Sequence, residues 1–309
     1  MKKNYRRNLF LLASLLLFIG CSQKTPITWE KRILDSNIKP ISLYYDEYGD
    51  KSKKTIVFLH GFGENHHTWR FLVPKLATKY HLIMLDLKGF GDSPKPKNKA
   101  YSVYDQALLV SQFLEKEKLK NITLVGRSFG GGVALIMALL QENKLIDKNI
   151  EKLILIDSMS YSQKLPSMME TLNTPFIGYL GIHFLDNEKI AREGYRFAFY
   201  NDSLIPEESV QATAAYLTFP RAKYAYLETV HQLVPDDILT LEKRYKEITL
   251  PTLILWGKED ISISVNKAYR LRRALKNSRL KIFPKVGHMP QEENPNAVSD
   301  EILKFMNSN

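Results

Sequence analysis

The chain has 309 residues, and 44% of them are hydrophobic, so it can bury a sizeable core as one large domain or as one domain with an insertion. This composition excludes a disordered chain, and a single cysteine excludes an intrachain disulfide. The formal net charge is +11, but no basic block is interleaved with aromatic residues. The sequence therefore predicts no nucleic-acid partner and a set of lysines scattered over a solvated surface.

The first twenty residues differ in character from the rest of the chain. Four basic residues among the first seven precede an almost unbroken apolar run over residues 9–19, which is too short to span a bilayer comfortably. We predict an export signal over residues 1–20. The rest of the chain then carries a formal charge of +7, which favours an anionic membrane surface.

The end of this segment predicts how it is processed. Gly20 followed by Cys21 resembles a bacterial lipobox, although Phe18 stands where leucine is usual. In that interpretation Cys21 becomes the lipid-modified N-terminus of a lipoprotein anchored in the bacterial cell envelope. The alternative is an uncleaved N-terminal anchor with a chance cysteine. Both interpretations place the body of the protein outside the cytoplasm at a membrane.

Predicted strands and helices alternate over most of the remaining chain. Residues 21–40 are predicted to be a tether, because they contain two prolines and no sustained period. An antiparallel hairpin of residues 41–45 and 55–59 is predicted to open the sheet. Further strands are predicted at residues 81–85, 122–125, 153–156, 252–256 and 280–283, and helices at residues 69–80, 105–114, 133–140, 265–275 and 295–306. This alternation predicts the α/β class, with a mostly parallel central sheet and helices on both faces.

One segment interrupts the alternation. Residues 158–234 are helix-prone, contain no clear strand, and are broken by proline, glycine and asparagine. We predict that they form a helical insertion into a core made of residues 41–157 and 235–309. The insertion is rich in aromatic residues and methionine, most of which are expected to pack its helices onto the core, while a minority line an apolar pocket.

The motif with the clearest chemistry is Gly126-Arg127-Ser128-Phe129-Gly130. It has the G-x-S-x-G pattern and lies between a short β-prone run and a run of helix-forming residues, so it predicts a strand, a very tight turn and a helix. The glycines on either side would let strand and helix pass closely, and the serine would stand exposed on the turn. The pattern alone is equally compatible with an incidental serine in a glycine-rich turn.

The loops that follow the later predicted strands supply a base and an acid. In a parallel sheet such loops meet at one edge, so their polar residues can converge. His288 follows the strand ending at Phe283 and is the predicted general base. Asp260 follows the strand over residues 252–256 and is the predicted acid that orients His288, with Asp157 as the alternative.

The same edge should also hold donors for an oxyanion. The N–H groups of Phe129, at the start of the predicted helix, and of Phe62, in the segment His60-Gly61-Phe62-Gly63, are the predicted oxyanion hole. No cofactor or metal is predicted. Glu64, His66 and His67 lack the paired spacing of a metal site and are only a weak alternative.

Five motifs in this order resemble the α/β-hydrolase superfamily with a helical cap, from about residue 41 to the end. They are His60-Gly61-Phe62-Gly63, Asp86-Leu87-Lys88-Gly89-Phe90-Gly91-Asp92-Ser93, Gly126-Arg127-Ser128-Phe129-Gly130-Gly131, Trp256-Gly257-Lys258-Glu259-Asp260 and Gly287-His288. The serine argues against the dehalogenase and epoxide hydrolase branches, which resemble this pattern but use an aspartate at the turn. Arg127 departs from the histidine or asparagine of many relatives.

The resemblance implies a serine hydrolase whose insertion, residues 158–234, is a cap that controls entry to the site. We predict a membrane-tethered enzyme that cleaves carboxylic esters, with medium-chain acyl esters or monoacylglycerols as substrates. A carbon–carbon bond hydrolase with the same three residues is the alternative within enzymes. A catalytically silent binding module of the envelope is the alternative outside them, although such relatives usually lose one of the three residues.

Overall fold

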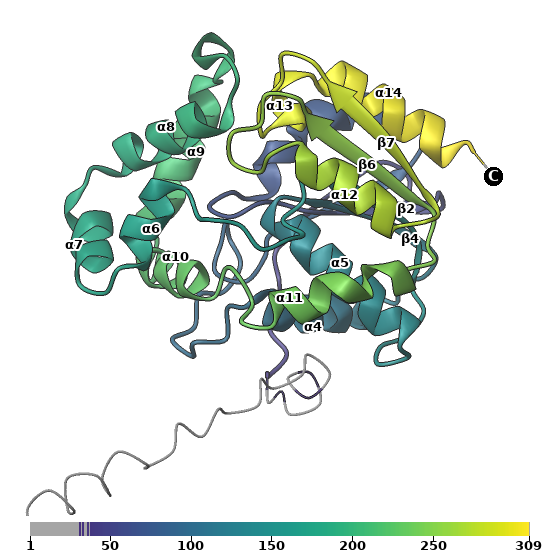
Figure 1. The fold of residues 1–309 in the computed structure, drawn as a ribbon, viewed down its shortest axis with the longest axis horizontal. Helices are drawn as coiled ribbons and strands as arrows, with labels where there is room; N and C mark the ends of the chain where they lie inside the picture. Colours follow the sequence, from purple (N-terminus) through teal and green to yellow (C-terminus); the bar gives the residue numbers. More distant parts are fainter. Residues whose placement is uncertain (1–30, 32, 34–35, 37, 309) are drawn as a thin grey trace, which may run out of the picture.

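The computed structural model describes residues 31, 33, 36 and 38–308 (Figure 1). The predicted export signal, Cys21 and most of the predicted tether lie outside the described residues. No helix within the described part of the chain is both long and apolar enough to cross a membrane.

Within the described residues, seven strands form one sheet in the order β1-β3-β2-β4-β5-β6-β7. Every neighbouring pair is parallel except β1 and β3, which are antiparallel. This is the mostly parallel α/β sheet that the alternation of elements predicted. The strands are β1 (Tyr45–Tyr48), β2 (Thr55–Leu59), β3 (His81–Leu85), β4 (Ile122–Arg127), β5 (Ile150–Ile156), β6 (Thr252–Gly257) and β7 (Ser278–Phe283).

The predicted hairpin at the start of the sheet is wrong. β1 pairs with β3, with Tyr45 opposite Leu85, and β3 lies between β1 and β2. All five residues of β3 are buried, so this strand needs a hydrogen-bonded neighbour on both sides. The chain between β1 and β2 is long enough to pass across the end of β3, which the local sequence signal for a hairpin does not reveal.

Helices cover both faces of the sheet, and successive strand residues point to opposite faces. In β2, Val57 and Leu59 face one core layer while Ile56 and Phe58 face the other. The first layer packs against α4 (Val103–Lys116), α5 (Phe129–Glu142) and α12 (Asn266–Ala274). The second packs against η1 (His66–Leu72), α3 (Val73–Leu76) and α14 (Pro295–Met306). A capping box of Ser102 and Asp105 begins α4.

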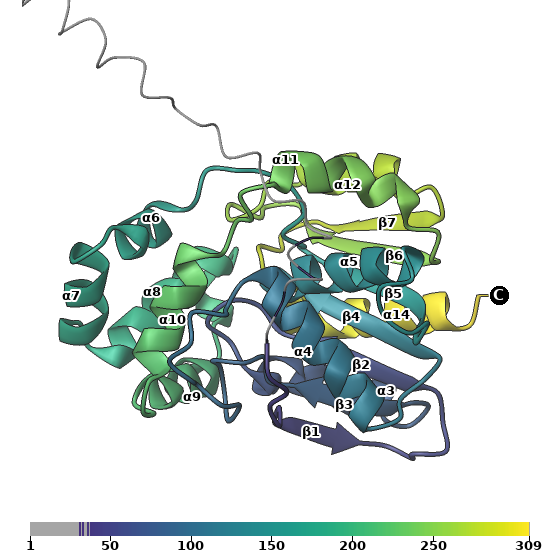
Figure 2. The same cartoon turned by 90° about the horizontal axis from the view of Figure 1, so that it is seen from below.

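The chain between β5 and β6 contains helices and no strand. Its first helices, α6 to α10, form a group of their own beyond the arrowhead ends of the parallel strands, as the two views show (Figure 1, Figure 2). They are α6 (Ser167–Asn173), α7 (Ile177–Phe184), α8 (Asn187–Ala198), α9 (Glu207–Leu217) and α10 (Ala222–His231), with a short 3-10 turn, η2 (Asp202–Leu204), between α8 and α9. The chain then returns to the sheet through α11 (Ile238–Leu241) and η3 (Glu242–Glu247). The group therefore lies over the edge where the catalytic loops are expected.

Candidate active site

Ser128 lies in a strained turn between β4 and α5. Its φ of 50° and ψ of −116° belong to a region that L-residues rarely occupy. The surrounding backbone holds it there: the Ser128 N–H donates to the Ile156 carbonyl at 2.9 Å, and its carbonyl accepts from Gly132 at 3.1 Å and from Met159 at 2.9 Å. Strain of this kind persists only where neighbouring contacts over-determine it, and it is concentrated at functional sites.

The glycines two residues before and after Ser128 are required by close backbone contacts. A Cβ at Gly126 would collide with the Gly130 carbonyl, and a Cβ at Gly130 would collide with the Leu59 and His60 carbonyls. Strand β4 and helix α5 therefore approach each other as closely as the motif predicted, and the serine is the residue that the turn leaves at the surface of the pocket.

The structure brings Ser128, His288 and Asp260 together in one hydrogen-bonded chain. The Nε2 atom of His288 lies 2.9 Å from Ser128 Oγ, and its Nδ1 atom lies 2.7 Å from Asp260 Oδ2. The other oxygen of Asp260 accepts from the backbone N–H groups of Ser262 and Ile263 at 2.7 and 2.8 Å. With the proton on Nδ1, His288 donates to Asp260 and leaves Nε2 to accept the serine proton.

The electrostatics keep Asp260 ionised. Burial opposes its charge, but the nearby His288 and the hydrogen bonds that the carboxylate accepts outweigh burial, so the pKa of Asp260 is lowered. His288 is only 6% exposed, and its Nδ1 atom lies beside the Asp260 carboxylate.

Asp157 lies at the end of β5, behind the acid that contacts His288. It is fully buried, and its Oδ1 accepts from the Gly257 N–H at 3.0 Å. Burial and the charge of Asp260 raise the pKa of Asp157, so it is the neutral member of the two carboxyls. The hydrogen bond from His288 goes to Asp260 and not to Asp157.

The two predicted oxyanion amides lie on segments that meet beside Ser128. Phe129 is the first residue of α5, and Phe62 lies in the loop after β2; neither amide donates a hydrogen bond to any residue that the structure describes. The N-terminus of α5 adds the positive end of a helix dipole. Two N–H groups and a helix end are therefore available to an anion at this position.

Two clusters within residues 38–308 bring three potential metal ligands within reach of one another. The first cluster consists of Asp157, Asp260 and His288. The second consists of His66, Asp86 and Asp92. Asp86 in the second cluster already accepts from the backbone N–H groups of His66 and Asp92 and from the His66 ring. The predicted weak metal group of Glu64, His66 and His67 is not assembled in either cluster, because Glu64 pairs with Arg127 instead.

The loop that carries His288 is contacted by two residues to which the sequence analysis gave no functional role. Arg127 donates from Nε and Nη2 to the His288 carbonyl at 3.2 and 2.8 Å. Glu293, in α13 (Pro290–Glu293), accepts from the backbone N–H groups of Gly287 and Met289 at 2.9 and 3.2 Å. Their only sequence signals are a charged residue inside the turn motif and an acidic residue shortly after the histidine.

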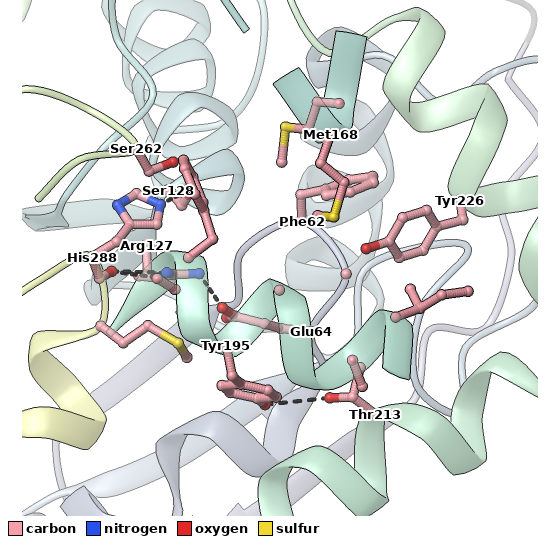
Figure 3. A pocket seen from close by; sticks show the side chains of 18 of the residues that line it. Phe62, Glu64, Arg127, Ser128, Met168, Tyr195, Thr213, Tyr226, Ser262 and His288 are labelled. Atoms are coloured by element: carbon pink, nitrogen blue, oxygen red, sulfur yellow. Dashed lines mark hydrogen bonds and ion pairs between the residues drawn. The ribbon is translucent and has the colours of Figure 1, made fainter. Parts of the chain in front are cut away.

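A pocket of about 690 Å³, part of it open to solvent, lies between the sheet edge and the helices α6 to α10 (Figure 3). Ser128 and His288 lie at one side of it, and Phe62, Met168 and Tyr226 line another part. Its apolar lining also includes Met169, Ile190, Phe197, Leu217 and Met289, and its polar lining Glu64, Arg127, Tyr195, Thr213 and Ser262.

Only part of the aromatic and methionine content of residues 158–234 faces this pocket. Met168, Met169, Tyr195, Phe197 and Tyr226 line it. Several others are exposed to solvent and neither line the pocket nor pack onto the core: Phe176, Tyr179, Phe184 and Tyr200 are 74%, 55%, 82% and 50% exposed. The composition of the segment predicted an apolar pocket lining without showing which residues form it.

Known proteins resemble this chain over most of its length. A profile of the alpha/beta hydrolase fold matches residues 54–295. The chain is 29% identical over 277 residues to an uncharacterized hydrolase, YugF, of Bacillus subtilis, covering 86% of this chain and 94% of that protein. It is 28% identical over 302 residues to Lipase 1 of Psychrobacter immobilis, covering 94% and 90%. A meta-cleavage product hydrolase from Pseudomonas fluorescens superposes with a TM-score of 0.71 at 20% identity, covering 86% and 94%. The chain is a hydrolase that belongs to the alpha/beta hydrolase fold family, as its motifs predicted.

Proposed function

We propose that this hydrolase cleaves carboxylic esters through an acyl-enzyme on Ser128. The observation that carries the proposal is the chain of hydrogen bonds from Ser128 through His288 to Asp260 at the side of an apolar pocket. A nucleophile, a base and an orienting acid in this arrangement are what acyl transfer by serine requires.

The reaction follows from the atoms that the site holds. Ser128 Oγ attacks the acyl carbonyl while His288 Nε2 takes its proton, and the carbonyl oxygen becomes an oxyanion held by the N–H groups of Phe62 and Phe129. When the bond to the alcohol breaks, His288 returns the proton to the leaving oxygen, and the acyl group stays on Ser128. A water molecule, deprotonated by His288, then releases the acid and regenerates the hydroxyl.

The pocket supports an acyl chain of medium length as the substrate group. Its lining beside Ser128 is largely aliphatic, aromatic and methionine, and each buried methylene contributes about 0.8 kcal/mol. We propose medium-chain esters and monoacylglycerols as substrates, with α6 to α10 acting as the cap that limits entry. The similarity to a protein named as a lipase supports this class of substrate.

The N-terminal sequence supports the location that we propose, the bacterial cell envelope with a lipid anchor on Cys21. An anchored enzyme would meet amphiphilic esters at high local concentration. Signal cleavage and acylation should place the wild-type protein in the detergent phase of a phase-partition assay, and Cys21→Ser should prevent processing, so that the variant keeps residues 1–20 and carries no acyl chain. An intact mass that shows an unmodified Cys21 in the wild-type protein would contradict the anchor and leave the esterase proposal standing.

A fluorophosphonate probe and an ester panel test the activity together. The wild-type protein should be labelled covalently and should hydrolyse p-nitrophenyl esters, with the label on Ser128. A folded wild-type protein that is unlabelled and inactive on every ester would favour the silent binding module. Hydrolysis of a vinylogous diketone faster than any ester would favour carbon–carbon bond cleavage by the same residues.

A further inference from the structure

Three loops of the site meet at the side chain of Arg127. They are the loop after β2 that carries Phe62, the turn that carries Ser128, and the loop before α13 that carries His288. Figure 3 shows Arg127 between Glu64 and His288, with an interaction to each. Arg127 is 3% exposed and Glu64 is 9% exposed, so the contacts are made away from bulk water.

On one side, Arg127 fixes the backbone of the base. Two of its N–H groups converge on the His288 carbonyl, at 3.2 Å from Nε and 2.8 Å from Nη2. The N–H of His288 donates to the carbonyl of Ala198 at 2.6 Å, at the end of α8. Both backbone polar groups of His288 are therefore held, and Arg127 is the partner that comes from the serine turn itself.

On the other side, Arg127 fixes the loop that carries an oxyanion amide. Its Nη1 atom pairs with Oε1 of Glu64, whose Oε2 accepts from the Gly61 N–H at 3.0 Å. The loop is closed further by the Glu64 N–H, which donates to the Gly61 carbonyl at 3.4 Å. A Cβ at Gly61 would collide with Arg127, so guanidinium and loop are in direct contact. The Phe62 amide lies in the chain between Gly61 and Glu64, which these hydrogen bonds hold in place.

Stability is a poor explanation for this pair. Removing two charges from water is costly, and an apolar pair of similar volume often stabilises a protein as well or better. The pattern of contacts has a different consequence. One guanidinium contacts both the loop of the base, His288, and the loop of the oxyanion donor, Phe62, so it sets the spacing of these two groups around Ser128. Catalysis is sensitive to displacements of this kind on the order of 1 Å.

We propose that Arg127 and Glu64 are positioning residues that set His288 and the Phe62 amide relative to Ser128. The inference rests on the proposed serine hydrolase function and extends it to two residues that act through others. Arg127 has five N–H donors, and three of them are bonded to His288 and Glu64. The guanidinium therefore binds mainly protein atoms, although it borders the pocket.

The test compares single and double variants. Arg127→Gln or Glu64→Gln leaves one buried charge without its partner, which destabilises a fold strongly, so each should lower Tm. The double variant Arg127→Gln/Glu64→Gln removes both charges and should recover most of the lost Tm. Its kcat should nevertheless stay about 10²-fold or more below wild type, as expected for a misplaced oxyanion donor, while KM changes little. A trifluoromethyl ketone, which forms an oxyanion adduct, should lose affinity in proportion to kcat.

A spectroscopic readout tests the proposal without a substrate. The proton between His288 Nδ1 and Asp260 should give a far-downfield proton NMR signal in the wild-type protein, and the double variant should broaden or shift it. Arg70→Gln is the matched control, because Arg70 contacts the buried Glu292 at 3.4 Å and touches none of the three reacting residues. This control should lower Tm and leave the signal and kcat unchanged.

The outcomes separate the two proposals. A double variant with wild-type kcat and an unchanged proton signal would overturn the positioning role, and a loss confined to KM would assign the pair to substrate binding instead. A wild-type protein that shows the signal but neither labels with a fluorophosphonate nor cleaves esters would overturn the proposed function. In that case the response of the signal to the double variant still decides whether the pair positions His288.

Discussion

In α5 every residue from Phe129 to Gln141 is buried, whereas in α7 only Gly178 and Ile182 are. The first helix begins next to Ser128 and packs into the main core. The second lies in the group of helices over the pocket and carries Phe184, which is 82% exposed. A helix that is buried on all sides tolerates little movement, and one with few buried contacts can shift or change in sequence at small cost. We therefore expect the core to fix the chemistry, and the helices α6 to α10 to be the part that can adapt to a substrate.

The largest expected effect belongs to the core side of this comparison. Ser128→Ala removes only the attacking oxygen, so turnover should fall on the order of 10⁴-fold or more, and the fluorophosphonate label should disappear. Initial rates with a p-nitrophenyl ester, together with a Tm measurement, check this. A variant that keeps substantial activity while folded would show that the chemistry does not depend on the strained turn.

Substitutions of the two buried carboxyls should differ in kcat by almost as much as Ser128→Ala differs from wild type. Asp260→Asn should lower kcat by about 10⁴-fold, because the amide favours the wrong imidazole tautomer. Asp157→Asn should leave kcat nearly unchanged, since Asp157 is already neutral and Asn can still accept from the Gly257 N–H. Equal losses in the two variants would show that the carboxyls act as one unit.

The pH dependence of stability provides a second comparison of the same two residues. The folded pKa of Asp157 is raised, so its contribution to stability is complete below the ordinary pKa of aspartate and is lost as pH rises through the folded value. The folded pKa of Asp260 is lowered, so its contribution is present above the ordinary pKa and is lost as pH falls. The Tm of Asp157→Asn relative to wild type should therefore increase from acidic to neutral pH. A difference that is constant over this range would show that Asp157 keeps its ordinary pKa.

Matched leucine substitutions compare the packing of core and cap. Leu124, in β4, is fully buried, so Leu124→Ala should lower the free energy of unfolding by about 2–5 kcal/mol. Leu185, at the end of α7, is 50% exposed, so Leu185→Ala should change it by about 0.5 kcal/mol or less. Urea unfolding of both variants measures these two changes. A large loss of unfolding free energy in Leu185→Ala would mean that the outer face of α7 is covered in solution.

The smallest expected effect is the change in kcat/KM for each methylene that is added to the acyl group of the substrate. If the pocket between core and cap takes the acyl chain, kcat/KM should rise from acetate by up to about fourfold per methylene, until the pocket is full. A series of p-nitrophenyl esters from acetate to palmitate measures this, and the maximum should lie at a medium chain. A monotonic fall from acetate onward would indicate a short-chain esterase whose cap is merely packed.

The sequence by itself determined the elements whose signals are local. Residues a few positions apart determine the turn at Ser128 and the strands that precede Asp260 and His288, because glycine geometry and apolar runs leave few choices there. Because parallel strands end at one edge, the positions of Ser128, His288 and Asp260 in the chain also predicted that their side chains would meet, and the structure places them in hydrogen-bond contact.

Only the tertiary structure decided what depends on partners far apart in the chain. The partner of β1 is β3 and not β2, because a strand buried along its whole length needs two neighbours. The choice of Asp260 over Asp157 for contact with His288 depends on how far each loop reaches beyond its strand. The pairing of Arg127 with Glu64 and the His288 carbonyl joins residues 63 and 161 positions apart, which no local pattern encodes. These contacts arise from the packing of whole elements, and packing is a property of the folded chain that residue spacing alone does not determine.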